Sequence, residues 1–439
     1  MLFQFTPNNR QSAARNWLLV LSLGCISIGA HAAPLTLNQA INSALHKQAL
    51  VQASRHQLEA QQDLSRSAEA RLLPALSLNA ATIWTQSRSG QPVFVSANGA
   101  REMLGQIRLH VPIYAPQTRA LSKLSEDRVT IERFHLLQTR LSVAAQVSMT
   151  YYRLALSNNM IAIWRRALVT ARQVFQATRD SYAAGTRSRL ALKQAQLNLL
   201  RIQSKLKQTL AQSVAIRQVL ALQTGLGSHL PTLAKISTPL KPLPDLSKIQ
   251  SRAMQAQPLL RTADAQIQAA HAQLQFHQSV RLPVFSANAA YGVDTATIPH
   301  SAQLGWQASL SLQMPIFGFG RNRDQIAAAR EQVAALQAAK SALQMQIRSR
   351  LAQDAGTARA ASIALKDAGE IEHSAQAVYD MTRKGYLAGA ESALALQQAE
   401  DAWVQAQLQA TNAIIRARLS RTQLILDSGF LPGQQGAFS

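Results

Sequence analysis

The distribution of proline is the feature that most limits how this chain can fold. Two stretches, residues 117–230 and 316–431, contain no proline and are rich in Ala, Leu and Gln. Proline breaks helix interiors, whereas Ala, Leu and Gln favour them, so each stretch predicts long helices. In the first stretch, apolar residues recur mostly at steps of three or four, as on one face of a helix. They are Phe134, Leu137, Leu141, Ala144, Val147, Tyr151, Leu154, Ile161, Trp164, Leu168, Ala171 and Val174.

A glycine near the middle of the first stretch allows the helix to reverse. Gly185 closes the segment Tyr182-Ala183-Ala184-Gly185, and glycine permits a tight turn there. We therefore expect one helix from Gln117 to Ala183 and a return helix from Arg187 to Leu222. At ~1.5 Å per residue the first helix would be roughly 100 Å long. A helix of this length is not expected in a compact globular domain, but it is expected in a protein that crosses the periplasm.

Four segments outside these stretches alternate between apolar and polar residues, which is typical of β-strands with two different faces. Each is about 9–12 residues long, as expected for strands that span a membrane in a barrel. We expect two hairpins, residues 74–114 and 283–317, with polar loops near 88–103 and 294–304. The apolar positions are Leu76, Leu78, Ala80, Trp84, Ile107, Leu109, Val111, Ile113, Phe285, Ala287, Ala289, Tyr291, Val293, Trp306, Ala308, Leu310, Leu312 and Met314.

The two halves of the chain repeat each other. Residues 182–195 and 386–399 are identical at nine of fourteen positions, at a constant offset of 204. Leu73-Pro74 likewise matches Leu282-Pro283, and Val111-Pro112-Ile113 matches Met314-Pro315-Ile316. This self-similarity indicates an internal duplication. We expect repeats at 33–224 and 247–430, joined by a Pro-rich connector at 225–246 and followed by a tail at 431–439, each repeat reading helix, two strands, long helix, turn and return helix.

The N-terminus predicts export. Two arginines precede the apolar run from Trp17 to Gly29, and Ala30-His31-Ala32 follows, a pattern typical of a secretory signal peptide covering residues 1–32. Cys25 is the only cysteine. It resembles the end of a lipidation motif, although Ser22 stands where a branched apolar residue is preferred. If Cys25 is removed with the signal, the mature chain uses no disulfide or thiolate chemistry.

The charge of the chain is strongly positive. Without residues 1–32, 43 basic and 22 acidic residues remain, a net charge of +21. Such a charge in a cytosolic protein would suggest nucleic acid as a partner. Export argues against this, and the basic residues are scattered along the chain rather than clustered beside aromatic residues, so we expect no nucleic-acid partner.

The number of strands predicts an oligomer. Four strands cannot close a barrel, and an open sheet edge cannot face lipid because its backbone groups would lack hydrogen-bond partners. Three copies give 12 strands and room for a pore, whereas the interior of an 8-stranded barrel is largely filled by side chains. The predicted fold class is therefore an α+β membrane protein in which long antiparallel helical hairpins form an α-barrel and four strands per chain contribute to a trimeric, 12-stranded β-barrel.

Several segments resemble the outer-membrane efflux (TolC-like) family. They are Leu35-Thr36-Leu37-Asn38-Gln39-Ala40, Leu282-Pro283 before a strand, Pro315-Ile316-Phe317 followed by Gly320-Arg321, and both Tyr-x-Ala-Gly turns. The resemblance covers essentially the whole mature chain. It implies a homotrimeric conduit in the outer membrane of a Gram-negative cell that docks a periplasmic membrane-fusion adaptor and an inner-membrane pump. We expect no enzyme activity and no cofactor, because conduction through such a duct needs no chemistry of its own.

The resemblance also implies where the adaptor binds. Both glycine turns would be periplasmic tips, and the matching adaptor-contact residues are Gly185, Ser188, Leu190, Gly389, Ser392 and Leu394. The alternative is that these residues only terminate helices and bind no partner. Some relatives carry a cation-sensitive pair of acids six and nine residues after the second tip glycine. This chain has Ala395 and Gln398 there, so we do not expect that gate.

Two further groups of residues suggest roles in the membrane or the lumen. Trp84, Tyr291 and Trp306 could form an interfacial aromatic belt, and Trp306 at a strand start fits this role best. For Trp84 the alternative is ordinary packing where the helices meet the barrel. Arg187, Arg189 and Lys193 near the first tip could line the lumen and favour anionic solutes. Alternatively, these basic residues form a solvated outer face or contact anionic lipid headgroups.

Catalytic and metal-binding patterns are weak in this sequence. His271 and His277 are six residues apart and do not share a helix face as metal ligands usually do. No phosphate-binding loop, nucleophile elbow or His-Glu metal motif occurs. The leading function is a passive exit duct for efflux, and type I protein secretion would use the same subunit. A different class also remains: a periplasmic coiled-coil adaptor or structural protein with soluble hairpins.

Overall fold

The computed structural model describes residues 33–89, 91–92, 101–227, 230–236, 240, 242–295 and 304–433. The predicted signal peptide with Cys25, parts of both polar loops and of the connector, and residues 434–439 lie outside the described residues. The first half contains α1 (Leu37–Lys47), α2 (Ala49–Ala70), β1 (Ala75–Trp84), β4 (Arg101–Tyr114), α3 (Pro116–Ala183) and α4 (Arg189–Thr224). The second half contains α5 (Leu246–Ala256), α6 (Pro258–Ser279), β5 (Val284–Thr295), β6 (Gly305–Gln313), α7 (Arg321–Leu387) and α8 (Ala393–Asp427). The two-residue strands β2 (Ser87–Arg88) and β3 (Gln91–Pro92) pair beyond β1.

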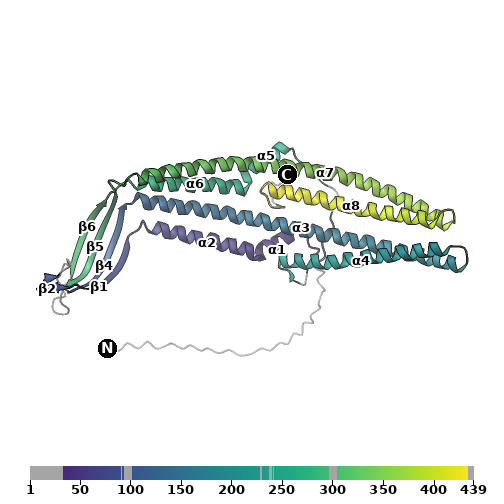
Figure 1. Ribbon diagram of the computed structural model, residues 1–439, viewed down its shortest axis with the longest axis horizontal. Helices are drawn as coiled ribbons and strands as arrows, with labels where there is room; N and C mark the ends of the chain where they lie inside the picture. The colour runs from purple at the N-terminus through teal and green to yellow at the C-terminus, as the bar shows by residue number, and fades with distance from the viewer. Residues whose placement is uncertain are drawn as a thin grey trace, which may run out of the picture.

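The long helices predicted from the proline-free stretches are confirmed. α3 has 68 residues and α7 has 67. Pro116 occupies the start of α3, where its missing N–H removes no intrahelical hydrogen bond. The chain is therefore an elongated rod of helices with the strands at one end and both helical turns at the other (Figure 1).

Two expectations about the elements were wrong in detail. A single helix was expected before each strand pair, but the backbone turns extended at Gln48, between α1 and α2, and at Gln257, between α5 and α6. Pro258 explains the second break, because proline disfavours helical backbone in the residue before it.

β4 has 14 residues, beyond the expected 9–12, and includes Pro112. The pairing with β5 shifts register between Pro112 and Tyr114, which is where a sheet tolerates proline.

The four long strands form one antiparallel sheet in the order β1-β4-β5-β6. The central pair, β4 and β5, joins the strand pair of the first half to that of the second. β1 and β6 are the sheet edges, and neither pairs with a second long strand within the described part of the chain. Directly opposed residues of antiparallel strands point to the same side of a sheet, so the register defines two faces.

One side of the sheet, the apolar face, carries mainly apolar side chains, and its large ones are exposed. Leu76 is 72 % exposed, Leu310 82 % and Trp306 81 %. The opposite side, the polar face, carries Ser77, Asn79, Gln106, Arg108, His110, Ser286, Asn288, Gln307, Ser309 and Ser311. An antiparallel sheet normally buries its apolar face, so a single chain leaves this sheet unfinished.

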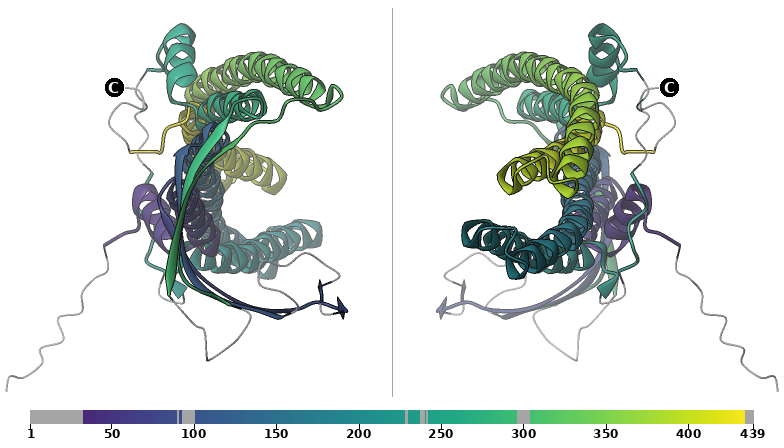
Figure 2. Two further views of the ribbon diagram at one scale, coloured as in Figure 1. Left: turned by 90° about the vertical axis from the view of Figure 1, so that its left-hand side faces the viewer. Right: turned by 90° about the vertical axis from the view of Figure 1, so that its right-hand side faces the viewer.

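The helices form a curved layer that is open on one side (Figure 2). Near the helical turns, α7 packs on α8, α8 on α3, and α3 on α4; nearer the strands, α7 packs on α6, α6 on α3, and α3 on α2. α7 therefore forms one edge of the layer, and α2 and α4 form the other. None of the helices in the described residues combines the length and hydropathy needed to cross a membrane.

The main hydrophobic core lies midway along the rod, where α1 and the ends of α4 and α8 meet α3. Ile41, Val147, Leu154 and Leu220 are each at most 2 % exposed and belong to this cluster. The hydroxyl of Tyr151 donates a hydrogen bond to the carbonyl of Leu35 at 2.9 Å, which ties the start of the described chain to α3. The largest cluster of buried apolar residues therefore lies in the middle of the rod, away from the strand end and the turn end.

Candidate functional site

The two helical turns at the end of the rod have the same local design. Gly185 and Gly389 adopt positive φ angles of 73° and 79°. In the first turn, Gly185 N donates to Tyr182 O at 3.0 Å and Thr186 N to Ser181 O at 2.9 Å, which is the Schellman pattern. The second turn repeats it, with Gly389 N donating to Tyr386 O at 3.2 Å and Ala390 N to Gly385 O at 2.9 Å. Glycine is favoured at both positions because a side chain would strain this backbone.

The return helices also begin in the same way. The hydroxyl of Ser188 accepts a hydrogen bond from Ala191 N at 3.2 Å, and that of Ser392 accepts one from Ala395 N at 3.0 Å. Both serines are helix N-caps, so a role in terminating the helices is enough to explain them. The leucines are different, because Leu190 is 67 % exposed and Leu394 50 % exposed. Two exposed leucines at the end of the rod have no role in terminating a helix.

The two turns are linked through Tyr386. Its hydroxyl lies 3.0 Å from the hydroxyl of Thr178 in α3. Because Thr178 already donates its proton to Val174 O at 2.7 Å, Tyr386 is the donor in this pair. The guanidinium of Arg187 lies 4.4 Å from the centre of the Tyr386 ring, a cation–π contact. One tyrosine of the second hairpin thus contacts both the long helix and the turn of the first.

A small aromatic core lies just above the turns. The rings of Tyr379 and Trp403 stack with centroids 4.8 Å apart, and Leu396 and Ala399 are buried beside them. Glu400 follows on α8 and is only 2 % exposed. Asn198 of α4 donates a hydrogen bond to Glu400 Oε2 at 3.2 Å, whereas Oε1 has no partner among the described residues.

Burial raises the pKa of Glu400 to about 7. The negative charge of Asp401 acts in the same direction, and the hydrogen bond from Asn198 opposes both. The carboxyl group is therefore held at the contact between α4 and α8 and exchanges its proton close to neutral pH instead of near pH 4.5. Glu400 and Asp401 are adjacent in the sequence, but the structure buries Glu400 and exposes Asp401.

The predicted basic residues lie around the first turn in different environments. Arg187 contacts Tyr386, whereas Arg189 and Lys193 are exposed. Arg189 and Lys193 belong to α4, which has six basic residues and no acidic one. The contribution of these residues to a lumen stays a prediction. The positions of the acidic gate in some relatives are taken by Ala395, which is half-buried, and Gln398, which is exposed.

The three predicted belt residues all lie on the apolar face of the sheet. Tyr291 and Trp306 are directly opposed, and Trp84 is opposed to Arg101. Trp84 is the last residue of β1 and Trp306 the second of β6, so both tryptophans are at the loop ends of their strands. They are 73 % and 81 % exposed, so neither packs against the helices of its own chain. An aromatic belt is compatible with these positions and stays a prediction.

Sequence reasoning missed the residues that join the two hairpins. Thr178, Asn198 and Tyr379 carry no motif, and Tyr386 was visible only as part of a turn. A signal did exist for Glu400, since Glu400 and Asp401 form the only pair of adjacent acidic residues on a return helix that is otherwise rich in Ala, Leu and Gln. Within the described residues, no three His, Cys, Asp or Glu side chains come together in a way that could hold a metal ion.

Comparisons with known proteins agree with this architecture. A protein family described as outer membrane efflux protein matches residues 40–228 and 249–426, which is more than half of the chain. No curated protein matches the sequence. Among solved structures, the CmeC outer membrane channel of Campylobacter jejuni is 15 % identical, with a TM-score of 0.77 over 91 % of this chain and 87 % of that chain.

Two further solved structures are similar. The outer membrane protein VceC of Vibrio cholerae is 16 % identical, with a TM-score of 0.77 over 90 % of this chain and 96 % of that chain. A membrane protein from Pseudomonas aeruginosa is 17 % identical, with a TM-score of 0.79 over 91 % and 92 % of the two chains. At these identities the structures establish the fold.

Proposed function

Because this chain belongs to the outer membrane efflux protein family, we propose that three copies of it form the exit duct of a tripartite efflux pump. The duct crosses the outer membrane as a β-barrel and extends into the periplasm as a tube of helices. A periplasmic adaptor docks at the helical turns and connects the duct to an inner-membrane pump. Transport through the duct is passive and needs no catalytic residue, since the pump supplies the energy.

The four-stranded sheet with two free edges is the observation that carries this proposal. The apolar face has the composition that lipid requires, but the free edges of β1 and β6 do not, because unpaired backbone groups are costly in lipid. Pairing β6 of one copy with β1 of the next satisfies both edges. Three copies then close a 12-stranded barrel by cyclic symmetry.

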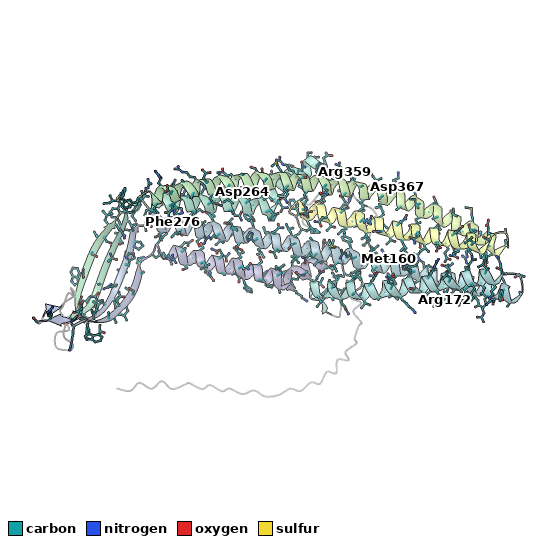
Figure 3. The ribbon with its side chains drawn as sticks, viewed as in Figure 1. Met160, Arg172, Asp264, Phe276, Arg359 and Asp367 are labelled. Atoms are coloured by element: carbon teal, nitrogen blue, oxygen red, sulfur yellow. The ribbon has the colours of Figure 1, made fainter. Side chains whose placement is uncertain are left out.

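The helices support the same assembly. The helical layer is an arc whose edges near the turns are α4 and α7 (Figure 2). Residues 162–197 of the first hairpin contain seven basic residues and one acidic residue, whereas the matching residues 366–401 contain three basic and seven acidic. Arg172 and Asp367, on the two hairpins, are examples (Figure 3). Opposite charges favour packing of the first hairpin of one copy beside the second hairpin of the next.

Disulfide cross-linking tests the closure of the barrel. The only cysteine, Cys25, lies in the predicted signal peptide, so introduced cysteines have no competitor in the mature chain. Ser77→Cys in β1 is combined in turn with Gln307→Cys, Ser309→Cys or Ser311→Cys in β6. We expect at least one pair to give covalent trimers on a non-reducing gel of the outer-membrane fraction.

The matched control combines Ser77→Cys with Asn288→Cys in the central strand β5. β4 separates β1 from β5 in the sheet, so this pair is not expected to cross-link. A water-soluble monomer with no cross-link from any β1–β6 pair would rule out the proposed duct.

The docking role of the turns needs a separate test. Leu190→Asp combined with Leu394→Asp replaces two exposed leucines at the turns by charges, and we expect loss of co-purification with the adaptor and increased drug susceptibility of the cell. Leu64→Asp, at a 59 % exposed leucine of α2, is the control. Trimer cross-linking of each variant shows that assembly is intact. Full docking by the double variant would contradict this role of the turns.

A further inference from the structure

The polar face of the sheet carries a positive charge in its middle rows. Arg108 lies on the central strand β4, opposite Ser77 of β1 and Ala290 of β5. His110 is two residues away on the same face, opposite Asn288. The side chains of Arg108 and His110 are both exposed. They are surrounded mainly by small or neutral polar residues.

Acidic residues of this face are distant from Arg108. Asp294 is opposed to Leu104, four residues along β4 from Arg108, which is about 13 Å at ~3.3 Å per residue. Glu102 is six residues away, or about 20 Å, toward the same loop end. Arg108 Nε donates to Gln106 Oε1 at 3.3 Å, and none of the ion pairs among the described residues includes Arg108. The guanidinium charge is therefore not neutralised on this face.

A hydrogen-bonded ladder fixes the neighbours of Arg108. His110 Nδ1 lies 2.7 Å from Asn288 Oδ1, and Asn288 Nδ2 donates to the hydroxyl of Ser311 at 3.3 Å. The hydroxyls of Ser311 and Ser286 are 2.7 Å apart. These side chains bond to each other across three strands and leave no carboxylate to pair with a cation. The polar face thus offers hydrogen-bond donors and positive charge at one level of the sheet.

We propose that Arg108, supported by His110, forms a cationic ring inside the barrel that selects for anionic solutes such as carboxylates, sulfonates and phosphates. The inference rests on the proposed function, because the polar face lines the interior only when three sheets close with their apolar faces toward lipid. Arginine suits this role because its guanidinium is always charged and pairs with planar or tetrahedral oxyanions through two parallel hydrogen bonds.

The ring is narrow enough to act on the whole lumen. Twelve strands spaced by ~4.8 Å and tilted by ~40° give a backbone radius of roughly 12 Å. The arginine side chain shortens the distance from its charge to the axis to about one Debye length, roughly 8 Å at physiological ionic strength. Three such charges around the lumen therefore act on solutes at the axis, as charged rings do in other pores.

Reversal potentials measure this selectivity directly. Purified trimers are reconstituted into planar bilayers of neutral lipid, and the chloride-to-potassium permeability ratio is obtained under a KCl gradient. We expect the wild-type channel to prefer chloride. Arg108→Gln should lower the ratio roughly five- to tenfold, because three unit charges acting through water and salt over about one Debye length favour chloride and disfavour potassium by roughly two- to threefold each. Arg108→Glu should reverse the preference, and Arg108→Lys should retain it.

The control is Arg101→Gln, on the same strand but on the apolar face, opposite Trp84. It removes the same net charge per copy and should leave the ratio unchanged. A cation-preferring wild-type channel, an unchanged ratio in Arg108→Gln, or an equal change in Arg101→Gln would overturn the inference while leaving the duct itself intact. Trimers that conduct no ions at all would instead count against the proposed duct, and the cationic ring would be rejected with it.

Discussion

The two hairpin turns have nearly the same sequence and the same backbone, yet they occupy different environments. Tyr182 and Tyr386 are equivalent residues of the duplication, but Tyr182 is 41 % exposed and Tyr386 is 7 % exposed. Farther up the return helices, Gln196 is half-buried, whereas its equivalent Glu400 is 2 % exposed. A duplicated segment thus keeps its local structure, while its surroundings depend on which neighbour it meets.

The difference arises because the hairpins pack asymmetrically. α8 of the second hairpin lies against α3 and α4 of the first, so its side chains enter the contact between the two hairpins. The return helix of the first hairpin, α4, lies at the free edge of the helical layer and keeps six basic residues without an acidic one. The inter-hairpin core therefore forms between α8 of the second hairpin and α3 of the first, whereas α4 of the first hairpin supplies an exposed basic edge.

The largest expected effect comes from truncating the two equivalent tyrosines. Tyr386→Ala removes a buried ring together with its hydrogen bond to Thr178, and losses of this kind cost about 3–5 kcal/mol. Tyr182→Ala removes an exposed ring and should cost less than about 1 kcal/mol. Thermal unfolding of the two variants in detergent compares them directly. Equal losses would show that the two turns are in equivalent environments.

The next effect depends on pH and on Glu400. The pKa of this carboxyl is about 7 in the folded protein and ordinarily 4.5. Below pH 4.5 both the folded and the unfolded state hold the proton, and the contribution of Glu400 to the free energy of unfolding is at its maximum. Between pH 4.5 and 7 only the unfolded state releases its proton, so stability falls by about 3 kcal/mol as pH rises, and it levels off above pH 7.

Glu400→Gln should therefore lack this decline. The measurement is the difference in Tm between wild type and variant from pH 5 to pH 8. The difference is needed because burial and the neighbouring Asp427 also raise the pKa of Asp354 to about 7, and this group is present in both proteins. Gln196→Glu, which places a carboxyl at the equivalent half-buried position of the first hairpin, should add little pH dependence. Parallel curves of Tm against pH for wild type and Glu400→Gln would contradict the raised pKa of Glu400.

The smallest effect tests what the two turns share. Gly185→Ala and Gly389→Ala each force a residue with a side chain into the left-handed backbone region, at a cost of about 1–2 kcal/mol. Because an added Cβ meets nothing within 4 Å at either glycine, the two costs should be equal. Thermal unfolding of the two variants under one condition measures them. A difference of more than ~1 kcal/mol would indicate that packing reaches these turns, contrary to the structure.

Much of the fold could be predicted from the sequence because the signals are local. Three signals involve only residues that are close together in the chain: the absence of proline, the helical spacing of apolar residues and the alternation of the strands. They predicted α3, α7 and the four long strands. Gly185 and Gly389 predicted the turns for the same reason. The breaks at Gln48 and Gln257 were missed; only the second had a local cause in Pro258.

The candidate site could be predicted only in part. Leu190 and Leu394 were predicted as contact residues from the turn motif, and the structure leaves both exposed. The link from Tyr386 to Thr178 and the contact of Glu400 with Asn198 join residues about 200 positions apart. No periodicity within one helix specifies such pairs, since they depend on how two hairpins approach each other.

The sequence by itself determined the length of the helices, the position of the turns, the two-faced strands and the family. Only the tertiary structure decided which copy of each duplicated residue is buried, and which side chains of separate strands share the face that carries Arg108. The physical reason is the range of the interactions. Backbone hydrogen bonding and periodicity act between near neighbours in the chain, whereas burial and charge act between whichever surfaces the fold brings together.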